Sequence, residues 1–203
     1  HALKKQGLLD NTWVIYMSDH GEMLGDHQMT GKEVFYSGSV NVPLLIRPPK
    51  GVQGWVSSGL TETIDLATTV LDIANAAPLP DSYGVSYQAG DTPKGQKGKA
   101  AVLSELVRYT MVYDSRYKLV VRTLTGEAME MYDTLHDPNE TKNLAKDVSF
   151  EQVRQQMMEQ YFHPLTARSD LEMLQKADTE NIVGPGGTTG VNGKNPFDVY
   201  LPK

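Results

Sequence analysis

The chain has 203 residues, enough for one sizeable hydrophobic core or for one domain with a small appendage. Its formal net charge of −6 argues against nucleic acid or an anionic membrane as a general partner, and no apolar run is long enough to span a bilayer. The absence of cysteine excludes disulfides, thiolate nucleophiles and cysteine-based zinc sites from these residues.

The first 50 residues predict a helix end followed by two buried strands. Residues 2–9 are typical of the last turns of a helix, with Gly7 as the residue that closes it, so we expect the chain to be part of a longer protein. Residues 12–17 and 40–47 are short apolar runs rich in β-branched residues, which is typical of buried strands. Strands that alternate with helices predict parallel βαβ construction.

The most informative stretch follows the first predicted strand, over residues 18–32. It holds two Asp-His pairs (Asp19-His20 and Asp26-His27) and Lys32, on a loop punctuated by glycines. Ligands of open α/β sheets bind beyond the carboxyl ends of strands, and crowding this many ionisable groups is costly unless a metal or an anion compensates. An isolated Asp-His pair would be better explained as a helix N-cap with a hydrogen-bonded neighbour. The second pair and the lysine favour a metal and anion site.

The donor types limit the metal without identifying it. Carboxylates with an imidazole and no thiolate suit calcium, magnesium, manganese or zinc. Only Asp19 and His20 are convincing ligands, fewer than the about four to seven that a divalent cation takes. No Gly-x-Ser-x-Gly segment is present, so a Ser-His-Asp hydrolase receives no support.

The rest of the chain predicts one long helix and then a small sheet. Apolar residues recur at helical spacing from Thr63 or Asp65 to about residue 77. Residues 101–106, 109–113, 117–122 and 129–133 predict an antiparallel meander, followed by helices at 149–164 and 168–177. We therefore expect three parts: residues 1–100, a β and helix subdomain at 101–180, and an extended tail at 181–203.

Residues 12–27, with Gly31 and Lys32, resemble the second sequence block of the sulfatases, in the alkaline phosphatase superfamily. The similarity is greatest to the branch that includes choline sulfatases and phosphonate monoester hydrolases. Further blocks follow in the family's order at 35–49, 63–72, 103–105, 116–118 and 131–145. The resemblance implies an α/β fold. Residues 1–100 would be the C-terminal part of an alkaline-phosphatase-like parallel-sheet sandwich that carries half the metal site, and a small antiparallel-sheet-and-helix subdomain would follow.

The resemblance also implies roles for four side chains of the polar loop. Asp19 would be a carboxylate ligand of a divalent cation, foremost calcium, with magnesium, manganese or zinc as alternatives. His20 would lie beside the metal and the sulfate oxygens, and Lys32 would bind the sulfate group and stabilise charge as the ester bond breaks. His27 would either orient the loop or touch the leaving group.

One family segment has no counterpart in this sequence. Relatives carry Cys-x-Pro-x-Arg or Ser-x-Pro-x-Arg upstream, where the Cys or Ser becomes the formylglycine nucleophile, and neither pattern occurs here. The chain therefore resembles only the C-terminal portion of a sulfatase. We expect no turnover and at best weak metal binding from it alone. Its expected partners are a sulfate-ester substrate and the N-terminal part of the same enzyme.

Two other functions remain as alternatives. A phosphonate monoester or phosphodiester hydrolase of the same superfamily would differ in its substrate pocket rather than in its metal chemistry. A non-catalytic binding module would need no upstream nucleophile. The resemblance leaves a homo-oligomer open, and it leaves the compartment open because a targeting segment would lie upstream of His1.

Overall fold

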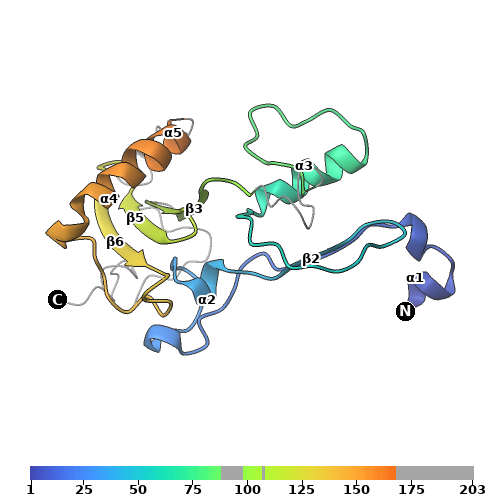
Figure 1. Cartoon of the computed structure of the whole chain (residues 1–203), viewed down its shortest axis with the longest axis horizontal. Coiled ribbons are helices and arrows are strands. Elements are labelled where there is room, and N and C mark those ends of the chain that lie inside the picture. Colours follow the sequence, from blue (N-terminus) through green and yellow to red (C-terminus); the bar gives the residue numbers. More distant parts are fainter. Residues whose placement is uncertain (88–97, 107, 168–203) are drawn as a thin grey trace. The chain divides into compact units, whose positions relative to one another are not determined.

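The computed structural model describes residues 1–87, 98–106 and 108–167 of the chain (Figure 1). The chain divides into two compact units. Unit 1 consists of residues 1–32 and 38–98, and unit 2 consists of residues 33–37 together with the chain from residue 99. Within the described ranges, no helix is long and apolar enough to cross a membrane. The helix predicted at 168–177 and the tail predicted at 181–203 lie outside the described residues.

Unit 1 begins with a short helix that ends as the sequence predicts. In α1 (Ala2–Lys5), the Gly7 amide donates to the Lys4 carbonyl at 3.2 Å and the Leu8 amide donates to the Leu3 carbonyl at 3.0 Å. Gly7 has a φ of 68°, so these bonds form a Schellman motif. The other helical segments that involve this unit are η1 (Leu9–Asn11), η2 (Asp26–Gln28), α2 (Ser37–Val40) and α3 (Ile64–Ile73).

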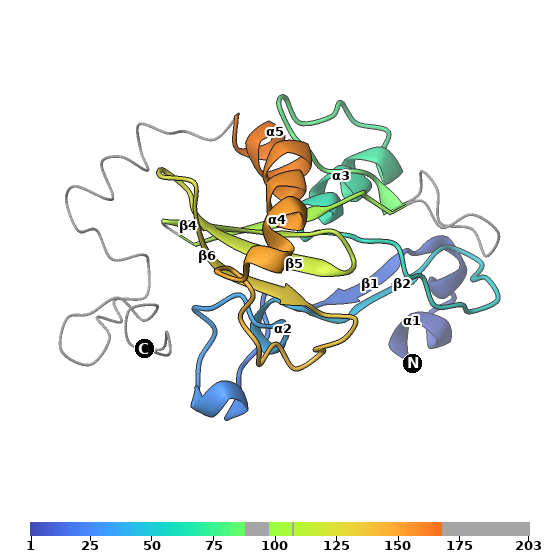
Figure 2. The ribbon, with the colours of Figure 1, turned by 60° about the vertical axis from the view of Figure 1, so that its left-hand side comes forward.

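The two strands of unit 1 pair antiparallel. Strand β1 (Val14–Met17) runs beside β2 (Leu44–Arg47) (Figure 2). In this pair Tyr16 lies directly opposite Leu45. The expectation of parallel pairing is therefore wrong for these two strands. An apolar run indicates a strand but not its direction, and residues 18–43 return as a hydrogen-bonded loop rather than as a crossover helix. Tyr16 and Leu45 are 62% and 60% exposed, so this face of the pair is open.

Helix α3 ends earlier than the sequence predicts. We expected it to reach about residue 77, but its last residue is Ile73. Asn75 adopts a left-handed conformation with a φ of 51°, and its amide donates to the Asp72 carbonyl at 3.1 Å. The Ala76 amide then donates to the Leu71 carbonyl at 2.9 Å. Asparagine tolerates this conformation better than most residues, so a second Schellman motif stops the helix at this point.

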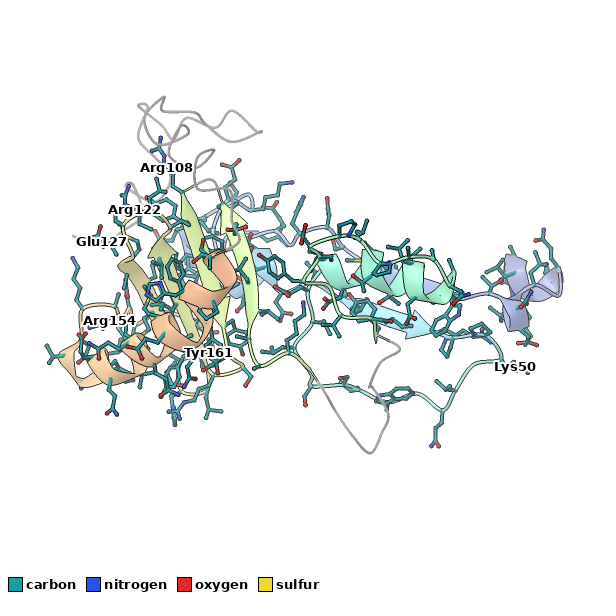
Figure 3. All side chains as sticks on the ribbon, turned by 90° about the horizontal axis from the view of Figure 1, so that it is seen from above. Lys50, Arg108, Arg122, Glu127, Arg154 and Tyr161 are labelled. Atoms are coloured by element: carbon teal, nitrogen blue, oxygen red, sulfur yellow. The ribbon has the colours of Figure 1, made fainter. Side chains whose placement is uncertain are left out.

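Unit 2 contains the antiparallel meander that the sequence predicts. Its strands are β3 (Val102–Leu106), β4 (Tyr109–Tyr113), β5 (Tyr117–Arg122) and β6 (Glu127–Asp133), and they pair in chain order. Asp114 shapes the β4–β5 turn, since its carboxylate accepts a hydrogen bond from the Tyr117 amide at 2.7 Å. At the other end of β5, Arg122 Nε lies 3.9 Å from Glu127 Oε2 across the β5–β6 turn (Figure 3).

Helices cover one face of this sheet. The segments η4 (Val148–Phe150), α4 (Glu151–Met157), η5 (Met158–Phe162, a π turn) and α5 (His163–Thr166) form a nearly continuous helical stretch where residues 149–164 predict one. Figure 2 shows α4 and α5 lying across the strands. The helices and the sheet share one buried core, made of Val112, Leu119, Val121, Met131, Leu144, Ala145, Met157 and Phe162.

The opposite face of the sheet receives residues 33–37, which come from far upstream in the chain. Leu119 points into the helical core, so its neighbour Lys118 points to the other face, as strand geometry requires. On that face the ring of Tyr36 lies 5.9 Å from the ring of Tyr132. The sheet of unit 2 is therefore buried on both sides.

Candidate functional site

The candidate site lies on the loop that follows β1. Asp19 and His20 come two and three residues after the end of the strand, where the chain leaves the β1–β2 pair. The Ser18 hydroxyl donates to the His20 carbonyl at 2.8 Å, and the His20 amide donates to Asp19 Oδ1 at 3.0 Å. These local bonds define the turn that carries both side chains.

The loop folds back on itself through backbone bonds. The Gly21 amide donates to the Ser39 carbonyl at 2.7 Å, and the Glu22 amide donates to the Gly38 carbonyl at 2.9 Å. A Cβ on Gly21 would overlap the Gly38 carbonyl oxygen, so the close approach requires glycine. The Met23 amide also donates to the carbonyl of Gly31, at 2.9 Å, which brings the end of the loop back to its start.

This fold brings Asp19, His20 and Lys32 together. The His20 Nδ1 donates to the Gly21 carbonyl at 2.8 Å, and a carbonyl oxygen can only accept, so that nitrogen carries the proton. The other ring nitrogen, Nε2, is in direct contact with the ammonium of Lys32. Nε2 also lies 3.5 Å from Asp19 Oδ2. The three residues that sequence assigns to one site thus form one cluster.

The Asp19 carboxyl is held in its charged form. Its pKa is lowered chiefly by the hydrogen bond from the His20 amide, and the nearby charges of His20 and Lys32 lower it further. The side chain is 85% exposed. An exposed and ionised carboxylate of this kind is a suitable oxygen ligand for a hard cation.

The structure places His27 on a separate turn. It lies within η2, seven residues after His20, in a left-handed conformation with a φ of 52°. The bonds described above connect His20, rather than His27, to Lys32. A role for His27 in orienting the loop or touching a leaving group stays a prediction.

A divalent cation would find part of its ligands here. Asp19 and His20 supply a carboxylate and an imidazole, which suit calcium, magnesium, manganese or zinc. Within the described residues, however, no group of three or more His, Asp or Glu side chains is arranged to hold a metal ion. The two residues fit a metal site as contributors and do not complete one.

Two contacts that support Lys32 could not be predicted from the motif. The Glu22 carboxylate accepts a hydrogen bond from the Gly31 amide, and the buried Ser39 hydroxyl donates to the carbonyl of Lys32. Both bonds join residues seven to nine positions apart, so they depend on how the loop closes. Glu22 and Ser39 both lie in blocks that resemble the sulfatases, but the sequence assigns neither of them a role.

The family comparison matches this part of the chain. Residues 1–76, which include the whole candidate site, match the family model of the sulfatases. The protein described as uncharacterized sulfatase YidJ of Escherichia coli K12 is 35% identical over 162 residues, which cover 73% of this chain and 31% of that protein. The N-acetylglucosamine-6-O-sulfatase of Bacteroides thetaiotaomicron is 30% identical over 171 residues, or 77% of this chain and 30% of that protein. The chain thus spans about a third of the length of these curated relatives.

Solved structures resemble the chain over most of its length. One structure, of a protein in complex with its substrate D-glucosamine-2-N,6-O-disulfate, matches with a TM-score of 0.70 and 27% identity over 87% of this chain and 37% of its own. The phosphonate monoester hydrolase of Agrobacterium radiobacter matches with a TM-score of 0.63 and 26% identity over 89% of this chain and 38% of its own. These neighbours confirm the α/β fold of alkaline phosphatase type. The chain belongs to the sulfatase family, within the alkaline phosphatase superfamily.

Proposed function

We propose that the chain is the C-terminal portion of a sulfuric ester hydrolase and contributes part of its metal and sulfate site. The observation that carries this proposal is the convergence of Asp19, His20 and Lys32 on one loop after β1. Membership of the sulfatase family supports the sulfate ester as the substrate class.

Lys32 has the chemistry to hold a sulfate group. An ammonium is a compact charge with three donors, and it suits the oxygens of a sulfuryl group, on which negative charge builds as the ester bond breaks. Nε2 of His20 lies against this ammonium. Lys32 would therefore both bind the sulfate and stabilise the transition state.

Asp19 and His20 would contribute ligands to a divalent cation, foremost calcium. When bound, such a cation supplies Lewis-acid stabilisation to the nucleophile and to a sulfuryl oxygen. The ionised state of Asp19, held by the His20 amide, keeps its oxygens available for this role.

Turnover needs a nucleophile that these 203 residues do not supply. The sequence contains no cysteine and no Ser-x-Pro-x-Arg segment, which in relatives become formylglycine. The N-terminal region of the enzyme would supply it, and the chain alone would be inactive.

The first test joins the chain to a nucleophile-bearing N-terminal sulfatase region and measures hydrolysis of an aryl sulfate and of glucosamine 6-sulfate. We expect Lys32→Ala to lower kcat/KM by about 10²–10³-fold, since it removes a charge aimed at the developing oxyanion. Lys5→Ala, which removes an equal charge from the exposed helix α1, serves as the matched control and should leave kcat/KM unchanged. Equal activity of the two variants would remove Lys32 from the site.

A second candidate is a phosphonate monoester or phosphodiester hydrolase. The structural match to the Agrobacterium radiobacter enzyme favours it. The same joined protein decides between the two candidates: faster cleavage of phenyl phosphonate or of a phosphodiester than of either sulfate ester would contradict the sulfatase proposal. Faster cleavage of a sulfate ester would support it.

A further inference from the structure

Residues 33–37 directly follow Lys32 and yet pack in unit 2. Residues 1–32 and the chain from Gly38 onward lie in unit 1, so the chain enters unit 2 for five residues and returns. Val34 and Phe35 are 8% and 1% exposed. We call residues 33–37 the anchored segment.

A buried ion pair is hydrogen-bonded to the anchored segment. Lys118 Nζ, from β5, donates to the Phe35 carbonyl at 2.9 Å and to Ser37 Oγ at 3.3 Å. Glu140 Oε2 accepts a hydrogen bond from the Ser37 amide at 2.7 Å. Lys118 and Glu140 also form a direct ion pair, and their side chains are only 4% and 2% exposed. We call these two residues the anchor pair.

Burying such a pair is costly, and its surroundings explain how it is held. Removing two charges from water carries a large desolvation cost, which their attraction offsets only when hydrogen bonds satisfy the remaining donors and acceptors. Here the atoms that satisfy them belong to the anchored segment. Glu140 also keeps a left-handed backbone with a φ of 53°, a strained conformation for this residue type that packing must enforce.

The other ionisable groups near the anchor pair leave the Lys118 ammonium paired with Glu140. The carboxyl of Glu130, on β6, is 6% exposed, and burial together with the charge of Glu140 raises its pKa to about 7. The Tyr132 hydroxyl is hydrogen-bonded to that carboxyl, and Tyr36 faces Tyr132. Below pH 7, where Glu130 is mostly protonated, the charges of Lys118 and Glu140 balance each other.

The geometry points to a role for the anchor pair at the sulfate site. We propose that Lys118 and Glu140 are positioning residues, which hold the anchored segment and so fix the backbone from which Lys32 projects. Ser39, on the other side of the segment, holds the Lys32 carbonyl, so the lysine is restrained from both directions along the chain. This inference rests on the proposed role of Lys32 in binding sulfate.

Three variants separate positioning from simple loss of the fold. Lys118→Met alone leaves the Glu140 carboxylate buried without its cation, which is strongly destabilising. Lys118→Met/Glu140→Gln removes both charges, and the glutamine can still accept from the Ser37 amide. Lys142→Met is the matched control, because Lys142 is an exposed lysine of the same unit.

Hydrogen exchange of the whole chain tests the anchor itself. In the folded double variant we expect the amides of residues 33–37 to exchange about tenfold faster, as the loss of a charge-assisted bond predicts, while the amides of β4 keep their rates. The Lys142→Met chain should match the wild type throughout. Unchanged exchange at residues 33–37 in the folded double variant would overturn the proposal.

Binding of inorganic sulfate tests the consequence for Lys32. Titration of the protein joined to the N-terminal sulfatase region and labelled with ¹³Cε-lysine should shift the Lys32 signal, which Lys32→Gln identifies by its loss. We expect the Kd for sulfate to rise about tenfold in the double variant and to stay constant in Lys142→Met. Equal affinities would overturn the positioning role. If the wild-type joined protein gives no saturable shift, the sulfate role of Lys32 is wrong, and the exchange experiment still decides whether the anchor exists.

Discussion

Asp133, at the end of β6, shows how strongly one side chain can be tuned by its neighbours. Its carboxylate accepts hydrogen bonds from Arg116 Nε at 3.2 Å and Nη2 at 2.8 Å, and from His136 Nδ1 at 3.0 Å. The bonds from Arg116, and then that from His136, lower the Asp133 pKa to about 2. The carboxylate is 9% exposed although both partners are largely open to solvent.

We expect Asp133→Asn to lower the free energy of unfolding by about 1–2 kcal/mol near pH 6, because it removes a charge-assisted network of partly exposed groups. The lowered pKa means that the wild type gains this stability above pH 4 and loses it as the pH falls towards 2. Urea unfolding at pH 2.5, 4 and 6 should show the gap closing. Glu159→Gln, which removes an exposed charge, should show no such gap, and a gap independent of pH would contradict the assignment.

At the residue scale, the sequence predicts which residues form the candidate site better than it predicts the contacts that they make. Asp19, His20 and Lys32 can be chosen in advance, because the spacing of the motif is informative by itself. The hydrogen bond from Ser39 to the Lys32 carbonyl cannot be predicted, since it exists only after the loop has closed. The lowered pKa of Asp133 cannot be predicted either, since it depends on Arg116, seventeen residues away.

At the scale of elements, strand β6 carries a buried carboxyl with an unusual pKa. Glu130 lies among Glu140, Lys118, Tyr132 and Tyr36. Burial first, and then the Glu140 charge, raise its pKa from 4.5 to about 7. The raised pKa means that the folded chain loses stability as the pH rises from about 4.5 to 7.

We expect Glu130→Gln to abolish this loss. Relative to the wild type, the variant should gain stability between pH 5 and pH 8, by an amount on the order of 3 kcal/mol at most. Thermal or urea unfolding at pH 5, 6, 7 and 8 measures the change. Glu127→Gln alters an exposed carboxyl on the same strand and is the matched control. Parallel stability curves for the wild type and Glu130→Gln would contradict the raised pKa.

The sequence predicts those helices and strands whose pattern lies within their own residues. The four strands of the meander follow from short β-rich runs separated by turns, and the helix over 149–164 follows from its spacing. The antiparallel direction of β1 and β2 does not, because an apolar strand carries no sign of its partner's direction. The end of α3 depends on Asn75 adopting a left-handed conformation, which competes with a favourable apolar pattern.

At the scale of the whole molecule, the open face of the β1–β2 pair predicts association. Tyr16 and Leu45 are cross-strand neighbours, and more than half of each side chain is exposed. Apolar surface of this kind tends to be covered. We expect the isolated chain to self-associate at high concentration in sedimentation velocity, and Tyr16→Thr/Leu45→Thr to reduce the association.

Leu135→Thr provides the control for this prediction, because Leu135 is 68% exposed but lies in unit 2. It should associate as the wild type does. A wild-type chain that stays monomeric at all concentrations would show that the open face is tolerated by itself. Threonine preserves strand propensity, so the double variant should keep its fold.

The sequence predicts only part of the division into two units. A division near residue 100 follows from the change of pattern between α/β and meander. The return of residues 33–37 to the later unit does not, because the blocks that contain Lys118 and Glu140 give no sign that these two side chains meet or that they contact residues 33–37. Only burial and their bonds to the anchored segment reveal them.

The anchored segment has a consequence for the order of synthesis. Ser37 and Glu140 are 103 residues apart, so a ribosome adding about 5–20 residues per second makes the second roughly 5–20 s after the first. During that interval Phe35 has no sheet to cover, and closing so long a loop delays the contact further. The meander and its helices form from neighbouring residues and can be complete early. The slow event in folding is then the docking of the anchored segment, which is translated before the sheet that it covers, and Lys32 is set in place last.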